Sequence, residues 1–493
     1  MTISFNQIPG GLRVPFVGAE IDSSLASQGP ALLVYRGILI GQKTDDGTAA
    51  AGSLHRVTSA AQVSQLAGRG SMLHRMAIAW FASNTSTELW IGVLADDGSA
   101  VAAEGTITVE DEDPSGATAG TLALYLGGVR VTVAVAEDDE QDDVAAAINT
   151  AINANSDLPV TSSVEANVVT VTFRHGGEVG NGYDMRDSYR DGEKVPDGIT
   201  VDYDLPSGGQ TNPDLSDLIA VLGDSWYHIW SHPYTDSGSL TAIENELASR
   251  FGPLRMIDGV AITSHAGSHS ALTTLGDGRN SPHSSIVAQP GINVLTPPME
   301  YAAEVAAITA YYGQIDPARP FQTLRMTHAL PPVETDRFTL EERNQLLFEG
   351  IATTRVGAGD VVRLDRMITT YQEDDAGADD DAYLDVNTPL TLMYLRHDWR
   401  VRMQTRYPRH KLADSGTRFG PGQAVMTPQL GLAEAFGWFK EKEEQGLVEN
   451  FAQFKQDAIA ARNGSDPNRL DILLPPDLIN QLIVVAGKFQ WRL

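Results

Sequence analysis

Helical and strand patterns alternate along much of the chain between residues 31 and 335. Continuous apolar runs predict buried strands at 31–41, 88–94, 226–230, 256–263 and 285–288. Helical spacing predicts helices at 58–66, 71–81, 214–222, 239–251, 268–275 and 298–312, the first two capped by Thr58 and Ser71. Because strands that alternate with helices favour a largely parallel sheet, we predict one doubly wound α/β sheet made from two stretches of the chain.

A segment with a different pattern separates those two stretches. Residues 106–186 alternate apolar and polar positions with a period of two, as in TLALYLGGVRVTVAVA, around one predicted helix at 143–153. Between residues 96 and 143 there are thirteen Asp and Glu against the single Arg130. We therefore predict an acidic, β-rich inserted domain on the outer surface of the molecule, although such a charge run is more often simply a solvated face.

The C-terminal third begins with a helix and a hairpin. Thr339 and Glu342 have the spacing of a capping box, and two extended runs follow, joined by 357–360. Long helices are predicted from Thr388 and from Thr427, and two strands are predicted within 470–493. This indicates an α+β C-terminal domain in which the hairpin forms a small sheet with open edges.

Both chain ends have patterns that favour pairing with another chain. Residues 1–30 are rich in Pro and Gly yet too apolar for a free tail, and an apolar strand pattern lies close to the C-terminus. Since an exposed sheet edge is a template for an added strand, we expect the ends to add strands to neighbouring subunits. The predicted added residues are Ile3, Phe5, Ile8, Val14, Phe16, Ile483, Val485, Phe489 and Trp491, and the predicted receiving sheet contains Val362, Leu364 and Ile368.

These patterns divide the chain into six segments. They are an N-terminal arm (1–30), the first part of the α/β domain (31–95), the inserted domain (96–208), the second part of the α/β domain (209–335), the C-terminal domain (336–475) and a terminal strand or arm (476–493).

Composition narrows the class of protein. The 493 residues are 42% hydrophobic and include no Cys, which excludes disulfides and thiolate metal sites. The formal net charge of −29 argues against a nucleic-acid backbone as the main partner. Residues 1–16 lack the pattern of a signal peptide, and no apolar run is long enough for a membrane helix.

Three clusters suggest chemistry, each with a simpler interpretation. Gly223-Asp224-Ser225 precedes His228 and His232, as in one class of serine esterase, but also suits a turn before a strand. Two further histidines and Ser268 lie within 264–270, where Ser268 is also a good helix N-cap. The acidic run 373–381 lacks the spacing of a calcium loop, and no glycine-rich phosphate loop is present. We therefore expect no catalytic residues, no cofactor and no metal.

A basic stretch stands out in this acidic chain. Between 396 and 418 there are seven Arg or Lys against two Asp. A surface of this kind could contact an acidic neighbour, and pairing within the chain is the alternative. The candidate interface residues are Arg396, Arg400, Arg402, Arg406, Arg409 and Lys411.

Several blocks together resemble one known family. They are Ile8-Pro9 with Arg13-Val14-Pro15, LALYLGGVRVTVAV followed by TVTFRHGGEVGN, PGINVLTPPMEYAAEVAAI running into RNQLLFEGIATTRV and VRLDRMITTY, and the terminal strands. In order and texture they resemble the tail sheath proteins of Mu-like contractile-tailed bacteriophages and of related contractile injection particles. The resemblance implies a subtilisin-like α/β domain without protease chemistry, a C-terminal domain facing an inner tube, and terminal arms that add strands to neighbours.

The expected function is therefore structural. The chain would polymerise into a helical cylinder of stacked, hexameric rings around a tail tube, contact baseplate and tail terminator proteins, and contract to drive the tube through the host envelope. It would bind no nucleic acid, insert into no membrane, and be made and assembled in the host cytoplasm as part of the virion tail. The alternatives are the sheath of a phage-tail-like bacteriocin or injection particle, a passive adhesion or capsid protein, and a serine esterase.

Overall fold

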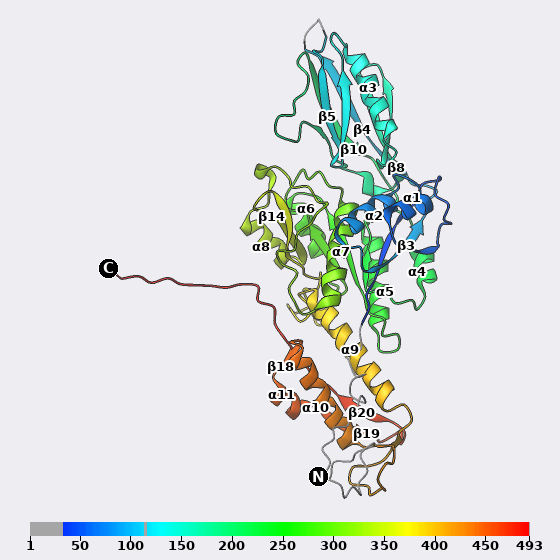
Figure 1. Cartoon of the computed structure of the whole chain (residues 1–493), viewed down its shortest axis with the longest axis vertical. Coiled ribbons are helices and arrows are strands. Elements are labelled where there is room, and N and C mark those ends of the chain that lie inside the picture. Colours follow the sequence, from blue (N-terminus) through cyan, green and yellow to red (C-terminus); the bar gives the residue numbers. More distant parts are fainter. Residues whose placement is uncertain (1–32, 113–115, 493) are drawn as a thin grey trace, which may run out of the picture.

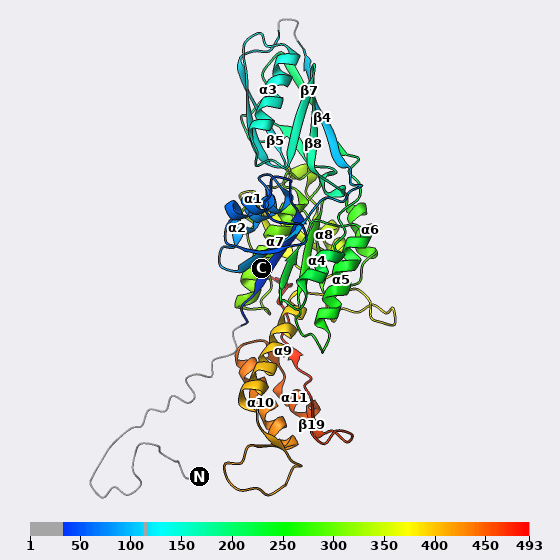
Figure 2. The ribbon, with the colours of Figure 1, turned by 90° about the vertical axis from the view of Figure 1, so that its right-hand side faces the viewer.

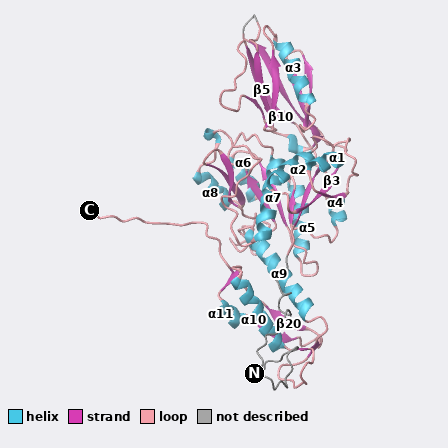
Figure 3. Ribbon diagram, viewed as in Figure 1, coloured by secondary structure: helices cyan, strands magenta, loops and turns pink. Residues whose placement is uncertain are grey.

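Three parts of the chain lie in a row. The computed structural model describes residues 33–112 and 116–492. A central α/β part has the inserted β-rich part at one end and a mainly helical C-terminal part at the other (Figure 1). Figure 3 shows the strands gathered in the first two parts and long helices dominating the third. The same order is seen after a 90° rotation (Figure 2), so the molecule is elongated.

The central part is organised by an eight-stranded sheet. Its strands are β1 (Arg36–Gln42), β2 (Leu54–Val57), β3 (Glu88–Leu94), β11 (Ile229–Ser231), β12 (Val260–His265), β13 (Ser284–Ala288), β14 (Ile351–Gly357) and β15 (Val361–Arg366). They lie in the order β15-β14-β13-β12-β11-β1-β3-β2, parallel from β14 to β3 and antiparallel at both edges. Strands β12 and β13 are almost wholly buried, as expected of parallel strands covered on both faces. The predicted parallel sheet from two stretches of chain is confirmed.

Helices surround this sheet. They are α1 (Ala60–Ala67), α2 (Met72–Ser83), α4 (Ser216–Leu222), α5 (Ser237–Phe251), α6 (His269–Asp277), α7 (Pro298–Ile315), α8 (Leu340–Phe348) and the short 3-10 helix η2 (Glu334–Asp336). Ser71 caps α2 as predicted, whereas α1 is capped by Ser59 and not by Thr58. Helix α7 is buried around most of its circumference because it packs against α2 on one side and against β11 and β12 on the other.

The predicted small sheet after α8 does not exist as a separate unit. The capping box of Thr339 and Glu342 is present, and the hairpin turns through Gly359 and Asp360 with positive φ. However, β14 pairs in parallel with β13 and thereby extends the central sheet. The predicted boundary at residues 335/336 is therefore wrong, because hydrogen bonding of a hairpin to a strand 65 residues earlier, Ile351 opposite Ile286, leaves no local signal. The buried residue of α8 is Leu346, and Leu340 at the start of the helix is exposed.

The inserted part is β-rich, as predicted. Its elements are β4 (Ala102–Asp111), β5 (Gly120–Leu126), β6 (Val129–Val135), α3 (Gln141–Ala154), β7 (Val160–Glu165), β8 (Val168–Gly176), the 3-10 helix η1 (Glu178–Gly180), β9 (Met185–Asp187) and β10 (Ile199–Ser207). They form a four-stranded sheet, β10-β4-β8-β7, and a three-stranded sheet, β6-β5-β9. Helix α3 packs against strands of both sheets. In β6 the buried valines alternate with exposed residues, which explains the period of two in the sequence.

The C-terminal part is built on two helices and short strand pairs. Its elements are α9 (Asn387–Arg406), β16 (Lys411–Leu412), β17 (Val425–Met426), α10 (Pro428–Glu444), β18 (Val448–Glu449), α11 (Phe451–Asp457), β19 (Ile459–Arg462), β20 (Leu470–Leu473) and β21 (Asp477–Leu478). The pairs are β16 with β17, β18 with β21, and β19 with β20. A separate core contains Trp438, Phe439 and Phe454. Helix α9 runs from the central part into this part and connects the two (Figures 1 and 2).

Candidate assembly surfaces

The last residues of the chain project away from the body. Beyond Leu482 the backbone of residues 483–492 is in neither a helix nor a strand, and Figure 1 shows it leading away from the three parts. Phe489 is 97% exposed, and Val485 and Trp491 are 80% and 78% exposed. Apolar side chains this exposed are costly in water, at about 25 cal/mol per Å² of apolar surface. The predicted terminal strand therefore has no partner strand within the described residues of its own chain.

The contacts just before this segment fix where it leaves the body. Strand β21 pairs with β18, and the amide of Ile479 donates to the carbonyl of Leu447. The side-chain amide of Gln322 donates to the carbonyl of Leu482 at 3.0 Å. Because these contacts end at Leu482, the segment from Ile483 onward is the part available to another chain.

The hairpin β19–β20 offers an edge of the complementary kind. Within the described chain, each of its strands pairs only with the other, so the outward backbone groups of both strands lack a strand partner. Helix α10 covers one face of the hairpin. On the other face Ile459 and Leu473 lie directly opposite each other and are 58% and 55% exposed. An apolar pair beside open edges suits an added strand.

The sequence predicted that β15 and Ile368, and not the β19–β20 hairpin, receive the added strand. This prediction is wrong. Val362 and Leu364 are buried, and the outer edge of β15 is already hydrogen bonded to residues 323–326 of the same chain. Ile368 is buried and bridges Asp385. The sequence contained a signal for the alternative, since Asn463-Gly464 separates two short runs with strand character. The predicted N-terminal residues Ile3, Phe5, Ile8, Val14 and Phe16 lie outside the described residues.

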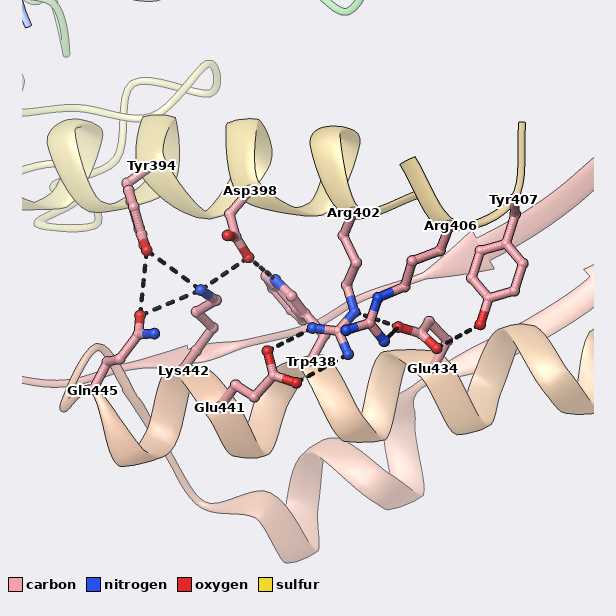
Figure 4. Close-up of polar contacts among 10 residues, drawn as sticks. All are labelled: Tyr394, Asp398, Arg402, Arg406, Tyr407, Glu434, Trp438, Glu441, Lys442 and Gln445. Carbon is pink, nitrogen blue, oxygen red and sulfur yellow. Dashed lines mark hydrogen bonds and ion pairs between the residues drawn. The ribbon is translucent and has the colours of Figure 1, made fainter. Parts of the chain in front are cut away.

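Most residues of the basic stretch form contacts within the chain. Arg402 pairs with Glu434 and Glu441, and Arg406 pairs with Glu434 across the α9–α10 interface (Figure 4). Burial disfavours the charged carboxylate of Glu434, but the hydrogen bond from Tyr407 and the pairing with Arg402 outweigh it and lower its pKa. These residues tie α9 to α10, so pairing within the chain accounts for them.

A buried ion pair lies on the same interface. The ammonium of Lys442 is 2.9 Å from the carboxylate of Asp398, and their side chains are 1% and 7% exposed. The indole of Trp438 also donates to Asp398, at 2.9 Å (Figure 4). Every polar partner of this carboxylate comes from α10, so the pair fixes the position of α10, and with it the β19–β20 hairpin, relative to α9.

The first two arginines of the stretch join α9 to the central part. Arg396 donates to the carbonyl of Phe251 at 2.7 Å and pairs with Asp258. Arg400 lies over the ring of Trp226. Of the predicted interface residues, Arg400, Arg409 and Lys411 lack an ion pair within the described chain, and Lys411 donates to Gln423. The candidate basic interface is therefore wrong for Arg396, Arg402 and Arg406.

The candidate catalytic groups do not assemble. Asp224 pairs with Arg255, and the ring of His228 is stacked against Tyr35 and Trp226, where burial lowers its pKa to about 3. Among the described residues, no hydrogen bond joins the hydroxyl of Ser225 to a histidine.

The second cluster is explained by the local fold. Ser268 caps α6 by accepting from the amide of Ala271. His265 ends β12 while His269 begins α6, so the two do not share a helix face. Within residues 33–112 and 116–492 no three His, Asp or Glu side chains are placed to hold a metal ion.

A buried charge cluster on α7 was not predicted from the sequence. Arg75 of α2 forms a bidentate pair with Glu300 at 2.7 and 2.9 Å. Glu304, one turn later, accepts from the amides of residues 327, 328 and 329. Two glutamates four residues apart in an otherwise apolar helix were the available signal. The cluster holds the strap 323–330, and thereby the covered edge of β15, against α7.

This cluster makes a pH-dependent prediction. Burial opposes the charged form of His328, but its hydrogen bond to Glu300 outweighs burial and raises the pKa of His328 above 6.5. Because the pKa of His328 is higher in the folded state, its protonated ring stabilises the fold fully below about pH 6.5. This contribution is lost as the pH rises through the folded-state pKa. We expect His328→Gln to lower the free energy of unfolding by about 1.5–3 kcal/mol near pH 5.5 and by clearly less near pH 8.5. Urea unfolding at both pH values measures this, and an equal loss at both would contradict it.

Comparisons with known proteins agree on one family. Residues 208–370 match the model of the phage tail sheath protein central domain, and residues 378–492 match that of the phage tail sheath C-terminal domain. The chain is 38% identical, over all of both chains, to the Mu-like prophage FluMu tail sheath protein of Haemophilus influenzae.

One solved structure is similar in fold. The sheath tail protein of Desulfitobacterium hafniense superimposes with a TM-score of 0.50 at 12% identity, over 94% of this chain and 97% of that one. A sheath tail protein of Listeria innocua gives a TM-score of 0.49 at 11% identity, over 93% of this chain and 94% of that one.

Among the helices of the described ranges, none has the length and apolar character of a membrane span.

Proposed function

This chain belongs to the phage tail sheath family, of the Mu-like type, and from that premise we propose how its surfaces build and drive a contractile sheath. The C-terminal segment that begins at Ile483 adds a strand to the β19–β20 hairpin of a neighbouring copy. One observation carries this proposal. The same polypeptide has an exposed, apolar segment without a partner strand and a hairpin whose outer edges have no partner strand within the described residues.

Strand addition suits a sheath that must change length without coming apart. Main-chain hydrogen bonds between the segment and the hairpin hold regardless of side-chain detail. The three parts of each subunit can then rotate as rigid bodies while residues 483–492 act as the flexible connection. The N-terminal segment 1–30 likewise adds a strand to a neighbouring copy.

The larger assembly follows from this connection. Copies of the chain form stacked rings, six subunits to a ring, in a helical cylinder around a tail tube, with the C-terminal part facing the tube and the acidic inserted part facing outward. The ends of the cylinder meet baseplate and tail terminator proteins. The subunit is made and assembled in the host cytoplasm, and contraction drives the tube through the host envelope.

No catalysis is required by this role. The extended cylinder is the state of higher free energy, and contraction exchanges a smaller interface between subunits for a larger one. The central sheet serves as a rigid, subtilisin-like scaffold without protease chemistry, in keeping with the dispersed positions of Ser225, Ser268 and the histidines.

Negative-stain microscopy of the purified full-length protein tests the proposal. Hollow cylinders with regular cross-striations are expected, because a one-segment-to-one-hairpin connection propagates from copy to copy. Closed shells, or small oligomers at every protein concentration, would overturn it.

A further inference from the structure

A depression beside α8 combines acidic and apolar groups on an otherwise unexplained surface. It has a volume of about 650 Å³ and lies between the C-terminal end of α8 and the loop 371–384. Its acidic lining is Glu373, Asp379, Asp380 and Asp381, and its apolar lining is Leu347, Phe348 and Leu384, together with the ring of Tyr371. Phe348 is 76% exposed at the rim.

The negative charge of this depression is not neutralised by its own chain. The one arginine in the lining, Arg366, is already held by Asp385 through two hydrogen bonds of 2.9 and 3.0 Å. Within the described part of the chain, none of the four lining carboxylates has an ion pair with a Lys or Arg. Next to Phe348, the hydrogen bond with the side chain of Asp277 raises the pKa of Glu349. This surface fits a partner that is both basic and apolar.

The end of the same polypeptide has that chemistry. Residues 488–492 read Lys-Phe-Gln-Trp-Arg, so each aromatic residue has a cation beside it. Phe489 and Trp491 are 97% and 78% exposed. Among the described residues, none forms an ion pair or a hydrogen bond with the side chain of Lys488 or Arg492. The ten residues from 483 to 492 can reach roughly 33 Å in an extended conformation.

We propose that the depression beside α8 binds the Lys488–Arg492 end of another copy of this chain. Phe489 or Trp491 packs against Phe348 and Leu347, and the flanking cations face Asp379 and Asp381. The inference rests on the proposed function, because assembly must bring a second copy's C-terminal segment to this face. It assigns the last residues a side-chain contact that is distinct from the strand formed by Ile483 and Val485. The hairpin and the depression lie in different parts of the body and need not belong to the same copy.

Engineered disulfides test this contact directly, because the chain has no cysteine of its own. The full-length Phe348→Cys/Phe489→Cys protein is assembled, checked for cylinders by negative stain, oxidised, and run on a non-reducing gel. Cross-linked dimers and higher species well above those of either single variant are expected. The matched control is Leu254→Cys/Phe489→Cys, because Leu254 is an apolar residue of the same central part and is 96% exposed; it should cross-link no more than the single variants.

Charge removal provides a second readout. Adding Asp379→Asn and Asp381→Asn to the cysteine pair should slow cross-linking about fivefold, whereas Asp138→Asn and Asp142→Asn in the inserted part should not. Cylinders without excess 348–489 cross-links would overturn this inference and leave the proposed function standing. Cross-links without cylinders would support the inference alone, and the absence of both would overturn both.

Discussion

Removing residues 483–493 is expected to abolish cylinder formation while leaving the folded subunit intact. The described residues beyond Leu482 make no backbone pairing and no side-chain hydrogen bond with the body, so the free energy of unfolding should change by less than about 0.5 kcal/mol. The strand added to the β19–β20 hairpin and the contact with the depression beside α8 both require that segment. Sedimentation and negative stain measure assembly, and urea unfolding measures stability.

The cut must fall after Leu482 for this result to be interpretable. A deletion that began at Asp477 would also remove β21 and the packing of Leu478 and Ile479 on the C-terminal core, and would confuse loss of fold with loss of assembly. As a control for the loss of exposed apolar side chains, Val221→Ser and Leu254→Ser change such side chains elsewhere and should leave cylinders unaffected. Cylinders of normal length from the truncated chain would contradict strand exchange through this end.

Asp398→Ala should be among the most destabilising single substitutions in the C-terminal part. It leaves the ammonium of Lys442, which is 1% exposed, without its carboxylate, and the indole of Trp438 without its acceptor. Breaking one partner of a buried ion pair costs about 3–5 kcal/mol, even though the intact pair adds little net stability. The loss should appear in urea unfolding, and assembly should become temperature-sensitive because α10 supports the β19–β20 hairpin.

Two variants separate this effect from a general loss of charge. Glu441→Ala removes a carboxylate from the same interface, but its side chain is 49% exposed, so a cost below about 1 kcal/mol is expected. Asp398→Leu/Lys442→Met removes both buried charges and should recover most of the stability lost in Asp398→Ala. Similar costs for Asp398→Ala and Glu441→Ala would show that the buried pair has no special role.

Elements with strong local signals were predictable from the sequence. The strand 88–94, the Ser71 cap and the capping box of Thr339 and Glu342 are all present, because side-chain periodicity and caps act within a few residues. The inserted β-rich part was also visible as a change of period and of charge. The exposed C-terminal segment was also visible, as an alternation of apolar positions within residues 483–491.

Long-range pairing set the limit of prediction. The hairpin β14–β15 has the same local pattern whether it stands alone or joins β13, and only the three-dimensional structure shows that residues 323–326 cover its outer edge. Likewise, the spacing of Arg402 and Arg406 on α9 could not reveal that Glu434 and Glu441 face them from α10. A run of charged residues in the sequence indicates an interaction surface only when it is known which of those charges are already paired within the chain.

The most direct test of strand exchange is a cryo-EM map of the assembled cylinder in which residues 483–492 can be traced from their own subunit. We expect residues 483–485 to lie as an added strand along the β19–β20 hairpin of a different copy. A map in which each segment folds back onto the body from which it emerges, with that hairpin unoccupied, would contradict it.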